Sequence, residues 1–376
     1  MVKYIDIEEF LKLEKENLPI IDVRSPAEYN HAHIPNAHNV YLFNDEERKE
    51  IGTIYKQIGR EEAVLKGLEF VAPKMTNILK SIDEITKNNN CNDKNKILMH
   101  CFRGGMRSES VAWLCSNYKY DVYVLRGGYK SYRRYVLDSF NRDYKIYLLT
   151  GKTGSGKTLI LNKLKEFGYN IIDLEYLAKH KGSAFGGINE GEQPTQEQFE
   201  NYLSKELIEY NNKIIWLEDE SFLIGKIAIP KPLFNAMKQP QKIIYLNVSK
   251  ESRAKYITET YGKYDINDLE KSILKIKNRL GGERMKEALE LLHKGKIYEC
   301  VLTLLYYYDK AYKLSIIEDK VINIECDNLD FDSITKLILL NVYCFASVRL
   351  CCCNDGFFVI EIFYLNNNFI SIKMHN

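Results

Sequence analysis

Short apolar runs alternate with segments of helical apolar spacing along most of this chain. The runs that predict buried strands cover residues 18–24, 96–100, 120–125, 147–150, 169–175, 213–218, 243–248 and 321–324. Between them, apolar residues recur at the spacing of amphipathic helices, as in 7–13, 44–72 and 269–312. In the second half of the chain this alternation predicts a parallel sheet with helices on both faces, so the fold class is α/β.

One glycine-rich segment lies between a predicted strand and a predicted helix and matches the P-loop pattern G-x-x-x-x-G-K-[ST]. It consists of Gly151, Lys152, Thr153, Gly154, Ser155, Gly156, Lys157 and Thr158. Such a loop turns successive backbone N–H groups toward a diphosphate at a helix N-terminus. Lys157 adds a positive charge, and Thr158 can hold a magnesium ion. The pattern predicts a phosphate site and leaves open whether the phosphates belong to a nucleotide.

Four carboxylates follow two of the predicted strands. Asp173 and Glu175 end the run 169–175, and Glu218 and Asp219 follow the run 213–218. Ligands of open α/β sheets bind at the carboxyl ends of the strands, where carboxylate oxygens can hold Mg2+. We therefore expect a magnesium ion beside Thr158. The alternative is that these side chains face water.

A cysteine-led loop follows the predicted strand 96–100. Cys101 lies where the strand ends and a helix begins, with Arg103 and Arg107 close by, so the helix dipole and the cations should favour the thiolate. Such a thiolate can accept sulfur or selenium as a persulfide or selenosulfide, with the loop N–H groups stabilising the terminal anion. The alternative is a small buried hydrophobic residue, which is our interpretation of Cys115 and Cys300.

The same loop fits a second pattern. His100, Cys101 and Arg107 match H-C-x5-R, the signature of cysteine phosphatases, whose loop binds a tetrahedral phosphate. In a single-domain protein this loop could belong to a phosphatase. The P-loop that follows it in this chain favours chalcogen chemistry instead.

Charge alone does not identify a polyanion partner, because 53 Lys and Arg face 51 Asp and Glu. Any nucleic-acid surface must therefore be a local basic patch. The candidates are Lys130, Arg133 and Arg134 around the start of a predicted linker helix, and Arg279, Arg284 and Lys286 in the helical segment. Tyrosines interleaved with the first group could stack on bases. The alternatives are a solvated helix face and arginines that pair with acids at the domain boundary.

The length of 376 residues is enough for two domains. We expect a first domain at 1–130, a linker helix at 131–144, a P-loop domain at 145–341 and an atypical, poorly packed tail at 342–376. The nine cysteines include no C-x-x-C pair, and neither a signal peptide nor an apolar run of ~18 residues is found. These features favour the reducing cytoplasm and no membrane partner.

Several motifs are similar in order and spacing to those of the bacterial tRNA 2-selenouridine synthases, in which a rhodanese-like domain precedes a P-loop domain. The opening resembles a rhodanese-like domain, with Asp22 and Arg24 after a strand, a helical turn carrying Glu28, and His-Ile-Pro-Asn-Ala at 33–37. The more specific motifs are Cys-Phe-Arg-Gly-Gly-Met-Arg-Ser at 101–108, Gly-Gly-Tyr-Lys-Ser-Tyr-Arg at 127–133, Asp-Leu-Glu at 173–175, His-Lys-Gly-Ser-Ala-Phe-Gly at 180–186, Gln-Pro-Thr-Gln at 193–196 and Glu-Asp-Glu-Ser at 218–221. Without these neighbours, Asp22 and Arg24 would be interpreted as a surface ion pair.

The resemblance implies a two-step reaction on wobble-position 2-thiouridine of tRNA. Geranyl diphosphate first alkylates the sulfur, and selenium from selenophosphate then displaces the S-geranyl group. In this scheme Cys101 is the chalcogen-bearing nucleophile, and the loop 151–158 is the diphosphate site. The implied partners are tRNA and an enzyme that supplies selenophosphate. Departures from the family pattern occur at His31-Ala32-His33, at Lys181 and in the tail.

A second function stays open on the residues alone. A P-loop domain could use ATP, so the alternative is an ATP-dependent rhodanese-type sulfurtransferase or a kinase-like enzyme that modifies tRNA. A third possibility is a non-catalytic module in which both domains only bind partners.

Overall fold

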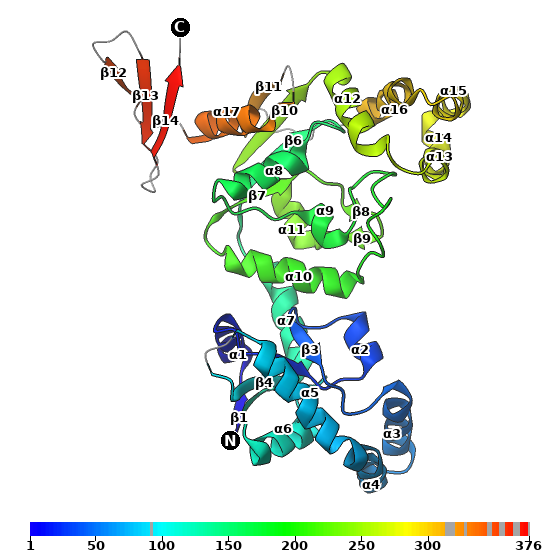
Figure 1. Cartoon of the computed structure of the whole chain (residues 1–376), viewed down its shortest axis with the longest axis vertical. Helices are drawn as coiled ribbons and strands as arrows, with labels where there is room; N and C mark the ends of the chain where they lie inside the picture. Colours follow the sequence, from blue (N-terminus) through cyan, green and yellow to red (C-terminus); the bar gives the residue numbers. More distant parts are fainter. Residues whose placement is uncertain are drawn as a thin grey trace. The chain divides into compact units, whose positions relative to one another are not determined.

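The computed structural model describes residues 1–90, 93–312, 320–326 and 329–343, together with the backbone of three later strands (Figure 1). The chain forms two compact units, each described here by itself. Unit 1 comprises Met1–Arg142 and Pro194–Glu209, and unit 2 comprises Asp143–Gln193 and Tyr210–Asn376. This division differs from boundaries at residues 130 and 144, because the helical segment after residue 130 and a later helix both belong to unit 1.

Unit 1 is built on a five-stranded parallel sheet of order β1-β5-β4-β2-β3. The strands are β1 (Val2–Ile5), β2 (Ile20–Asp22), β3 (Ala37–Asn39), β4 (Lys96–His100) and β5 (Asp121–Leu125). The helices are α1 (Ile7–Lys15), α2 (Pro26–His31), α3 (Asp45–Gln57), α4 (Arg60–Val71), η1 (Ala72–Lys74), α5 (Met75–Asn88), α6 (Met106–Tyr118), α7 (Gly128–Ser139) and α10 (Gln196–Glu209). The strands expected at 18–24, 96–100 and 120–125 and the helices expected at 7–13 and 44–72 are therefore confirmed.

Strand β4 carries the cysteine loop and lies between β5 and β2. Its residues Ile97, Leu98 and Met99 are each 0% exposed, as expected for a central parallel strand buried on both faces. The helices begin where the sequence provides caps. Ser25 and Glu28 form a capping box at the start of α2, and Asn44 and Glu47 form another at the start of α3.

The ion pair of Asp22 and Arg24 lies in the core of unit 1, so the alternative of a surface pair, already disfavoured by the neighbouring motifs, is excluded. The two side chains are 0% and 2% exposed, and Arg24 Nη2 lies 2.6 Å from Asp22 Oδ2. Arg24 also donates to the backbone oxygen of Ala32 at 2.8 Å and stacks on the ring of Tyr129 at 3.9 Å. A pattern of two charged residues after a strand cannot reveal burial, because α2 and α7 supply the cover.

Helix α10 packs in unit 1, although it lies between two segments of unit 2 in the sequence. Asn201 donates to the backbone oxygen of His33 and to the hydroxyl of Tyr129, both at 2.9 Å. The hydroxyls of Ser139 in α7 and Ser204 in α10 lie 2.8 Å apart in the core. The helix expected as a linker at 131–144 is therefore α7, which begins at Gly128 and packs against α10.

Unit 2 contains a four-stranded parallel sheet of order β11-β10-β6-β7. The strands are β6 (Lys145–Gly151), β7 (Ile214–Glu218), β10 (Lys242–Val248) and β11 (Val321–Cys326), and a small hairpin joins β8 (Leu223–Ile224) to β9 (Ile227–Ala228). The helices are α8 (Lys157–Glu166), α9 (Leu174–Ala178), α11 (Lys231–Met237), α12 (Lys250–Tyr261), α13 (Ile266–Lys275), α14 (Lys277–Leu280), α15 (Gly282–His293), α16 (Ile297–Ala311) and α17 (Phe331–Tyr343). Strand β11 lies at an edge of the sheet, as its short apolar run predicts.

The strand expected at 169–175 is not a strand. Its pairing is reduced to a single bridge between Ile171 and Trp216. The carboxylate of Asp173 accepts a hydrogen bond from the backbone of Tyr176 and caps α9, which begins at Leu174. The capping interaction turns the chain into a helix after three apolar residues, which is too early for a ladder to form.

The tail begins later than the sequence suggested. Val342, placed at its start, belongs to α17 and is 3% exposed in the core of unit 2. The backbone beyond forms an antiparallel sheet of β12 (Val348–Cys352), β13 (Phe358–Phe363) and β14 (Phe369–Met374). The side-chain packing predicted for this tail lies outside the described residues, as does Cys91.

Candidate functional site

The thiol of Cys101 lies at the carboxyl end of β4, directly before the N-terminus of α6. It is 3% exposed, and the hydroxyl of Ser108 donates a hydrogen bond to Sγ at 3.2 Å. Burial alone would raise the pKa of Cys101. The Ser108 hydroxyl, the backbone of Gly105 and Arg103, and the charge of Arg107 outweigh burial and lower this pKa. These surroundings favour the thiolate over the thiol, which is the direction that the sequence predicts.

The segment Gly127–Lys130 holds the cysteine loop in place. The backbone N–H of Tyr129 donates to the oxygen of Cys101 at 2.8 Å, and that of Lys130 donates to the oxygen of Phe102 at 3.0 Å. A Cβ at Gly128, whose φ is +56°, would lie 2.3 Å from the Cys101 oxygen. This close approach explains the glycine pair. The segment that the sequence suggested for RNA binding therefore has a structural role, because it positions the cysteine loop.

Arg107 is oriented by a carboxylate from α2. Its Nη1 and Nη2 atoms lie 2.6 and 3.2 Å from the two carboxylate oxygens of Glu28. A second arginine, Arg48 of α3, has its Nε atom 4.0 Å from Glu28 Oε2. No sequence pattern predicts that Arg48 lies near the cysteine loop, because α3 is dominated by charged residues and is typical of a solvated helix. Arg103, the other arginine of the loop, is exposed.

The P-loop of unit 2 has the expected form, with β6 before it and α8 beginning at Lys157. Lys157 Nζ donates to the backbone oxygen of Gly151 at 3.4 Å, and the buried hydroxyl of Ser155 has no hydrogen-bond partner among the described residues. Gly156 has a φ of +78°, and a Cβ there would lie 2.3 Å from the ring of Phe331. The unpartnered hydroxyl indicates a loop shaped for a ligand.

A buried arginine holds the P-loop in place, although no local sequence pattern predicts this role. Arg253 of α12 is 2% exposed and donates to the backbone oxygen of Thr153 at 3.1 Å. It also donates to the backbone oxygen of Val248 at 3.2 Å and forms a bidentate pair with Asp309 of α16 at 2.9 and 2.8 Å. Because α12 and α16 lie about 100 and 150 residues beyond the loop, local spacing does not reveal this tether.

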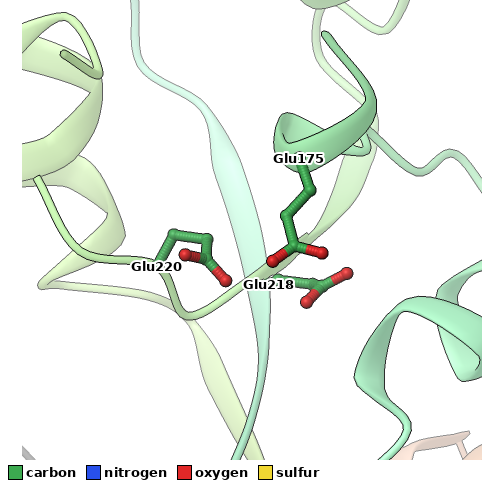
Figure 2. A group of neighbouring side chains, drawn as sticks. All are labelled: Glu175, Glu218 and Glu220. Atoms are coloured by element: carbon green, nitrogen blue, oxygen red, sulfur yellow. The ribbon is translucent and has the colours of Figure 1, made fainter. Parts of the chain in front are cut away.

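Three carboxylates gather beside Lys157. Figure 2 shows Glu175 of α9, Glu218 at the end of β7 and Glu220 pointing toward one another, and one oxygen of each lies within 4.8 Å of the others. The hydroxyl of Thr158 donates to Glu175 at 3.3 Å. Glu218 is 2% exposed, and its Oε1 has no hydrogen-bond partner among the described residues.

Burial is the largest cause that raises the pKa of all three carboxyls, and neighbouring acids add to it: the other cluster members for Glu175, Glu220 for Glu218, and Asp219 for Glu220. Burial works to lower the pKa of Lys157, but the charges of Glu218, Glu220 and Glu175 outweigh it and raise that pKa. A cluster of this kind either holds protons or binds a cation, because several adjacent buried negative charges are costly.

The structure brings two of the four predicted acids into this cluster. Glu175 and Glu218 belong to the cluster, whereas Asp173 caps α9 and Asp219 accepts from Thr150 at 2.9 Å. Glu220 was missed. Its signal was available, because residues two apart in an extended chain point to the same side, and Glu220 follows Glu218 by two.

The six basic candidates differ in their surroundings. Arg133 is 14% exposed, with Nη2 2.5 Å from Glu200 Oε2 and Nη1 2.6 Å from Asn201 Oδ1, so it fits the alternative of an arginine paired with acids. Lys130 and Arg134 are exposed, as are Arg279, Arg284 and Lys286. Arg284 stacks on Tyr306 at 4.0 Å. The first three lie in unit 1 and the last three in unit 2, so each group is a separate candidate surface.

The fold and the two sites define a protein in which a rhodanese-like domain with a buried cysteine loop is joined to a P-loop domain of the AAA type. Residues 6–135 match the profile described as rhodanese-like domain, and residues 144–328 match that described as tRNA 2-selenouridine synthase AAA domain. The fold class expected from the sequence is thus confirmed.

Relatives extend this match over most of the chain. A tRNA 2-selenouridine synthase of Hydrogenovibrio crunogenus is 33% identical over 339 residues, covering 81% of this chain and 91% of its own. The enzymes of Shewanella pealeana and Bdellovibrio bacteriovorus are 32% and 33% identical, covering 82% and 79% of this chain and 91% and 85% of their own. The chain belongs to the tRNA 2-selenouridine synthase family. In the part of the chain that the structure describes, no helix is both long and apolar enough to cross a bilayer.

Proposed function

We propose that this enzyme replaces sulfur by selenium in wobble-position 2-thiouridine of tRNA, with geranyl diphosphate and selenophosphate as co-substrates. The observation that carries the proposal is the presence of two different sites in one chain of this family. One is a P-loop with Lys157 and an unpartnered Ser155 hydroxyl, and the other is a loop with the low-pKa thiol of Cys101. A diphosphate leaving group suits the first site, and a chalcogen donor suits the second.

The first step is the alkylation of sulfur at the P-loop. The 2-thio sulfur forms a bond to C1 of the geranyl chain, the C1–O bond breaks, and diphosphate leaves with the electron pair, while N3 of the base loses its proton. Lys157 and the loop N–H groups stabilise the charge that develops on the leaving diphosphate. Arg253 acts as a positioning residue, because it holds the Thr153 carbonyl and with it the shape of the loop.

The second step takes place at the Cys101 loop. Selenium at the oxidation level of selenide bonds to C2 of the base, the bond from C2 to sulfur breaks, and geranylthiol leaves. The loop N–H groups and the arginines beside Cys101 suit a phosphoryl donor with negative oxygens. The tRNA must carry its wobble base from one site to the other, and such a base is flipped out of its stack to react.

Glu175, Glu218 and Glu220, with Thr158, suit a magnesium ion at the P-loop. The orphaned oxygen of buried Glu218 supports this assignment, because hard divalent cations bind carboxylate oxygens. When bound, Mg2+ would supply positive charge that offsets both the carboxylates and the diphosphate. Without it, the three acids would repel an incoming diphosphate.

The stability of the metal-free protein should fall with rising pH, and bound Mg2+ should reduce this fall. The folded-state pKa of these carboxyls is raised, so the metal-free protein binds protons there that the unfolded chain has lost. Its stability should therefore fall as pH rises from the ordinary carboxyl range through the raised pKa values, and Mg2+ should offset this loss. We expect Glu218→Gln to weaken Mg2+ binding by roughly tenfold or more. Calorimetric titration and thermal unfolding with and without Mg2+ at several pH values measure both effects, and Mg2+ affinity unchanged by the substitution would exclude this site.

The two neighbouring arginines of α7 separate tRNA binding from structural pairing. Arg134→Glu should weaken tRNA binding, because the exposed guanidinium group of Arg134 is expected to contact backbone phosphates. The number of counterions released on binding, given by the slope of log K against log salt concentration, should fall by about one. Arg133→Glu should lower the melting temperature instead, because it places a carboxylate against Glu200. Both affinities, for tRNA and for geranyl diphosphate, are measured on each folded variant. Equal losses for both ligands in Arg134→Glu would contradict the assignment to tRNA.

The decisive experiment for the proposed function is mass spectrometry of tRNA nucleosides. Cells that lack this gene and cells that express it are grown with selenite, and 2-selenouridine, S-geranyl-2-thiouridine and 2-thiouridine are quantified. We expect 2-selenouridine only where the protein is present. If both strains yield the same nucleosides, the proposed function is wrong.

The carboxylate cluster also favours a second candidate, an ATP-dependent sulfurtransferase or kinase-like enzyme, because Mg2+ accompanies nucleotides in P-loop sites. Magnesium-dependent ATP hydrolysis that thiolated tRNA stimulates would support it. Turnover of geranyl diphosphate without ATP hydrolysis would exclude it.

A further inference from the structure

The cysteine loop keeps a feature that a selenium carrier does not require. His100, Cys101 and Arg107 have the spacing of a cysteine phosphatase, and in the structure the next residue completes a phosphoryl-transfer arrangement. The hydroxyl of Ser108 lies 3.2 Å from Sγ of Cys101 and also donates to the backbone oxygen of Gly105 at 3.0 Å. A hydroxyl in this place stabilises the thiolate both as an attacking group and as a leaving group.

The charges around the thiol suit a phosphoryl group. Arg107 and Arg48 approach the same oxygen of Glu28, at 2.6 and 4.0 Å, so two guanidinium groups share one carboxylate. The two guanidinium groups and the one carboxylate carry a net charge of +1, which favours the thiolate and an anionic donor at Cys101. The Nε of Arg48 is buried and has no hydrogen-bond partner among the described residues. Guanidinium groups are matched to phosphoryl oxygens in geometry and charge.

We infer that Cys101 attacks the phosphorus atom, and not the selenium atom, of a selenophosphate-type donor, with Arg48 and Arg107 binding the phosphoryl oxygens. The identity of the donor rests on the function proposed above. The inference adds an activity to the cysteine loop, which is phosphoryl transfer to a thiolate. It also gives a role to Arg48, which lies outside the loop.

The reaction balances without any oxidant. The thiolate forms a bond to the phosphorus of a donor whose selenium carries a proton, the bond from phosphorus to selenium breaks, and the electron pair leaves with selenium as HSe⁻. Water then attacks phosphorus, the bond from sulfur to phosphorus breaks, and phosphate leaves as H2PO4⁻ with both protons of the water, while the thiolate of Cys101 is restored. HSe⁻ bonds to C2 of the S-geranyl base and passes its proton to N3, while geranylthiolate leaves. A bond between Cys101 and selenium would instead have to displace phosphite, with phosphorus reduced from P(V) to P(III), whereas attack on phosphorus changes no oxidation state.

The leaving group explains why this arrangement suits a chalcogen donor. Selenide and sulfide leave as stable anions, so the loop needs no acid to protonate them. An alkoxide leaving from a phosphate ester would need such an acid. The loop should therefore cleave thiophosphate and selenophosphate and act poorly on phosphate monoesters.

The test uses the full-length protein with inorganic thiophosphate as the probe, under anaerobic conditions. Intact mass after rapid quenching should show one phosphoryl group on Cys101, with one sulfide released for each group formed. Ser108→Ala should accumulate this intermediate, because its hydrolysis slows by roughly 100-fold when the hydroxyl is lost. Ser110→Ala is the matched control, since that hydroxyl bonds only to its own helix, at Met106, and should behave as wild type.

Arg48 is tested in the same assay. Arg48→Ala should raise the thiophosphate concentration needed for half-saturation by about tenfold, and Arg48→Lys should recover part of the loss. Lys49→Ala, an exposed neighbour on α3, should have no effect. If Arg48 has only a structural role, Arg48→Ala will lower the melting temperature without changing the thiophosphate concentration needed for half-saturation. This outcome would exclude Arg48 from the phosphoryl site.

Two outcomes overturn the inference. One is an adduct with the mass of a single sulfur atom on Cys101, and the other is a protein that neither gains a phosphoryl group nor releases sulfide, even as Ser108→Ala. Nucleosides from tRNA are analysed with the same preparations and selenophosphate. If 2-selenouridine forms while Cys101 carries no phosphoryl group, the inference fails and the proposed function stands. If phosphoryl transfer occurs without any modified nucleoside, the proposed function fails and the inference stands.

Discussion

Cys101→Ser is expected to abolish the formation of 2-selenouridine while S-geranyl-2-thiouridine still forms and accumulates. Although burial alone would raise the pKa of the Cys101 thiol, the Ser108 hydroxyl, the loop backbone and Arg107 lower it and so favour the thiolate, whereas a serine hydroxyl in the same place stays neutral. Loss of a nucleophile reduces turnover by roughly 1000-fold or more. Because the P-loop lies in the other unit, alkylation by geranyl diphosphate should continue. Nucleoside mass spectrometry of tRNA from cells that express the variant measures both products.

A second cysteine provides the control for this prediction. Cys115 lies on α6 behind the loop, and burial raises its pKa to about 12, so it is inert as a nucleophile. Cys115→Ala should retain selenation, apart from any loss of folded protein. Selenation retained by Cys101→Ser, or lost equally in both variants, would contradict the assignment of Cys101.

Lys157→Ala should stop the first step, so that neither S-geranyl-2-thiouridine nor 2-selenouridine is formed and 2-thiouridine accumulates. The pKa of Lys157 is raised by the neighbouring carboxylates, so the ammonium group keeps its charge throughout the neutral range. A lost donor at a developing negative charge costs about 2.7–4 kcal/mol, which corresponds to roughly 100- to 1000-fold in rate. Removing the lysine also leaves three carboxylates without their cation, which should further disfavour diphosphate. Geranylation of thiolated tRNA in vitro measures the effect.

Lys163 offers the matched control on the same helix. It pairs on the surface with Glu166 and Asp332, away from the phosphate loop, so Lys163→Ala should leave geranylation unchanged. Normal geranylation by Lys157→Ala would show that the diphosphate binds elsewhere.

The sequence by itself determined the two loops whose functional residues are neighbours in the chain. The P-loop requires eight neighbouring residues between a strand and a helix, and the Cys101 loop requires eight more, so spacing and residue type were enough to predict both. The strands β4, β6 and β10 were equally visible, because central parallel strands are apolar on both faces. The strand prediction was wrong at 169–175, because the cap formed by Asp173 ends the extended segment after one bridge.

Only the tertiary structure decided which distant residues complete each site. Glu28 and Arg48 reach the Cys101 loop from α2 and α3, and Arg253 and Asp309 hold the P-loop from α12 and α16. These side chains are ordinary helix residues in sequence, since a helix places charged residues at its surface whether they meet solvent or a neighbouring element.

Burial was likewise a property of packing and not of local pattern. Asp22 and Arg24 have the spacing of a surface pair, yet α2 and α7 enclose them. Arg133 and Arg134 are adjacent in sequence, but successive helix positions point about 100° apart, so Arg133 meets Glu200 of α10 and Arg134 meets solvent. The residue types of these pairs come from the sequence, and their partners come from elements brought against them by the fold.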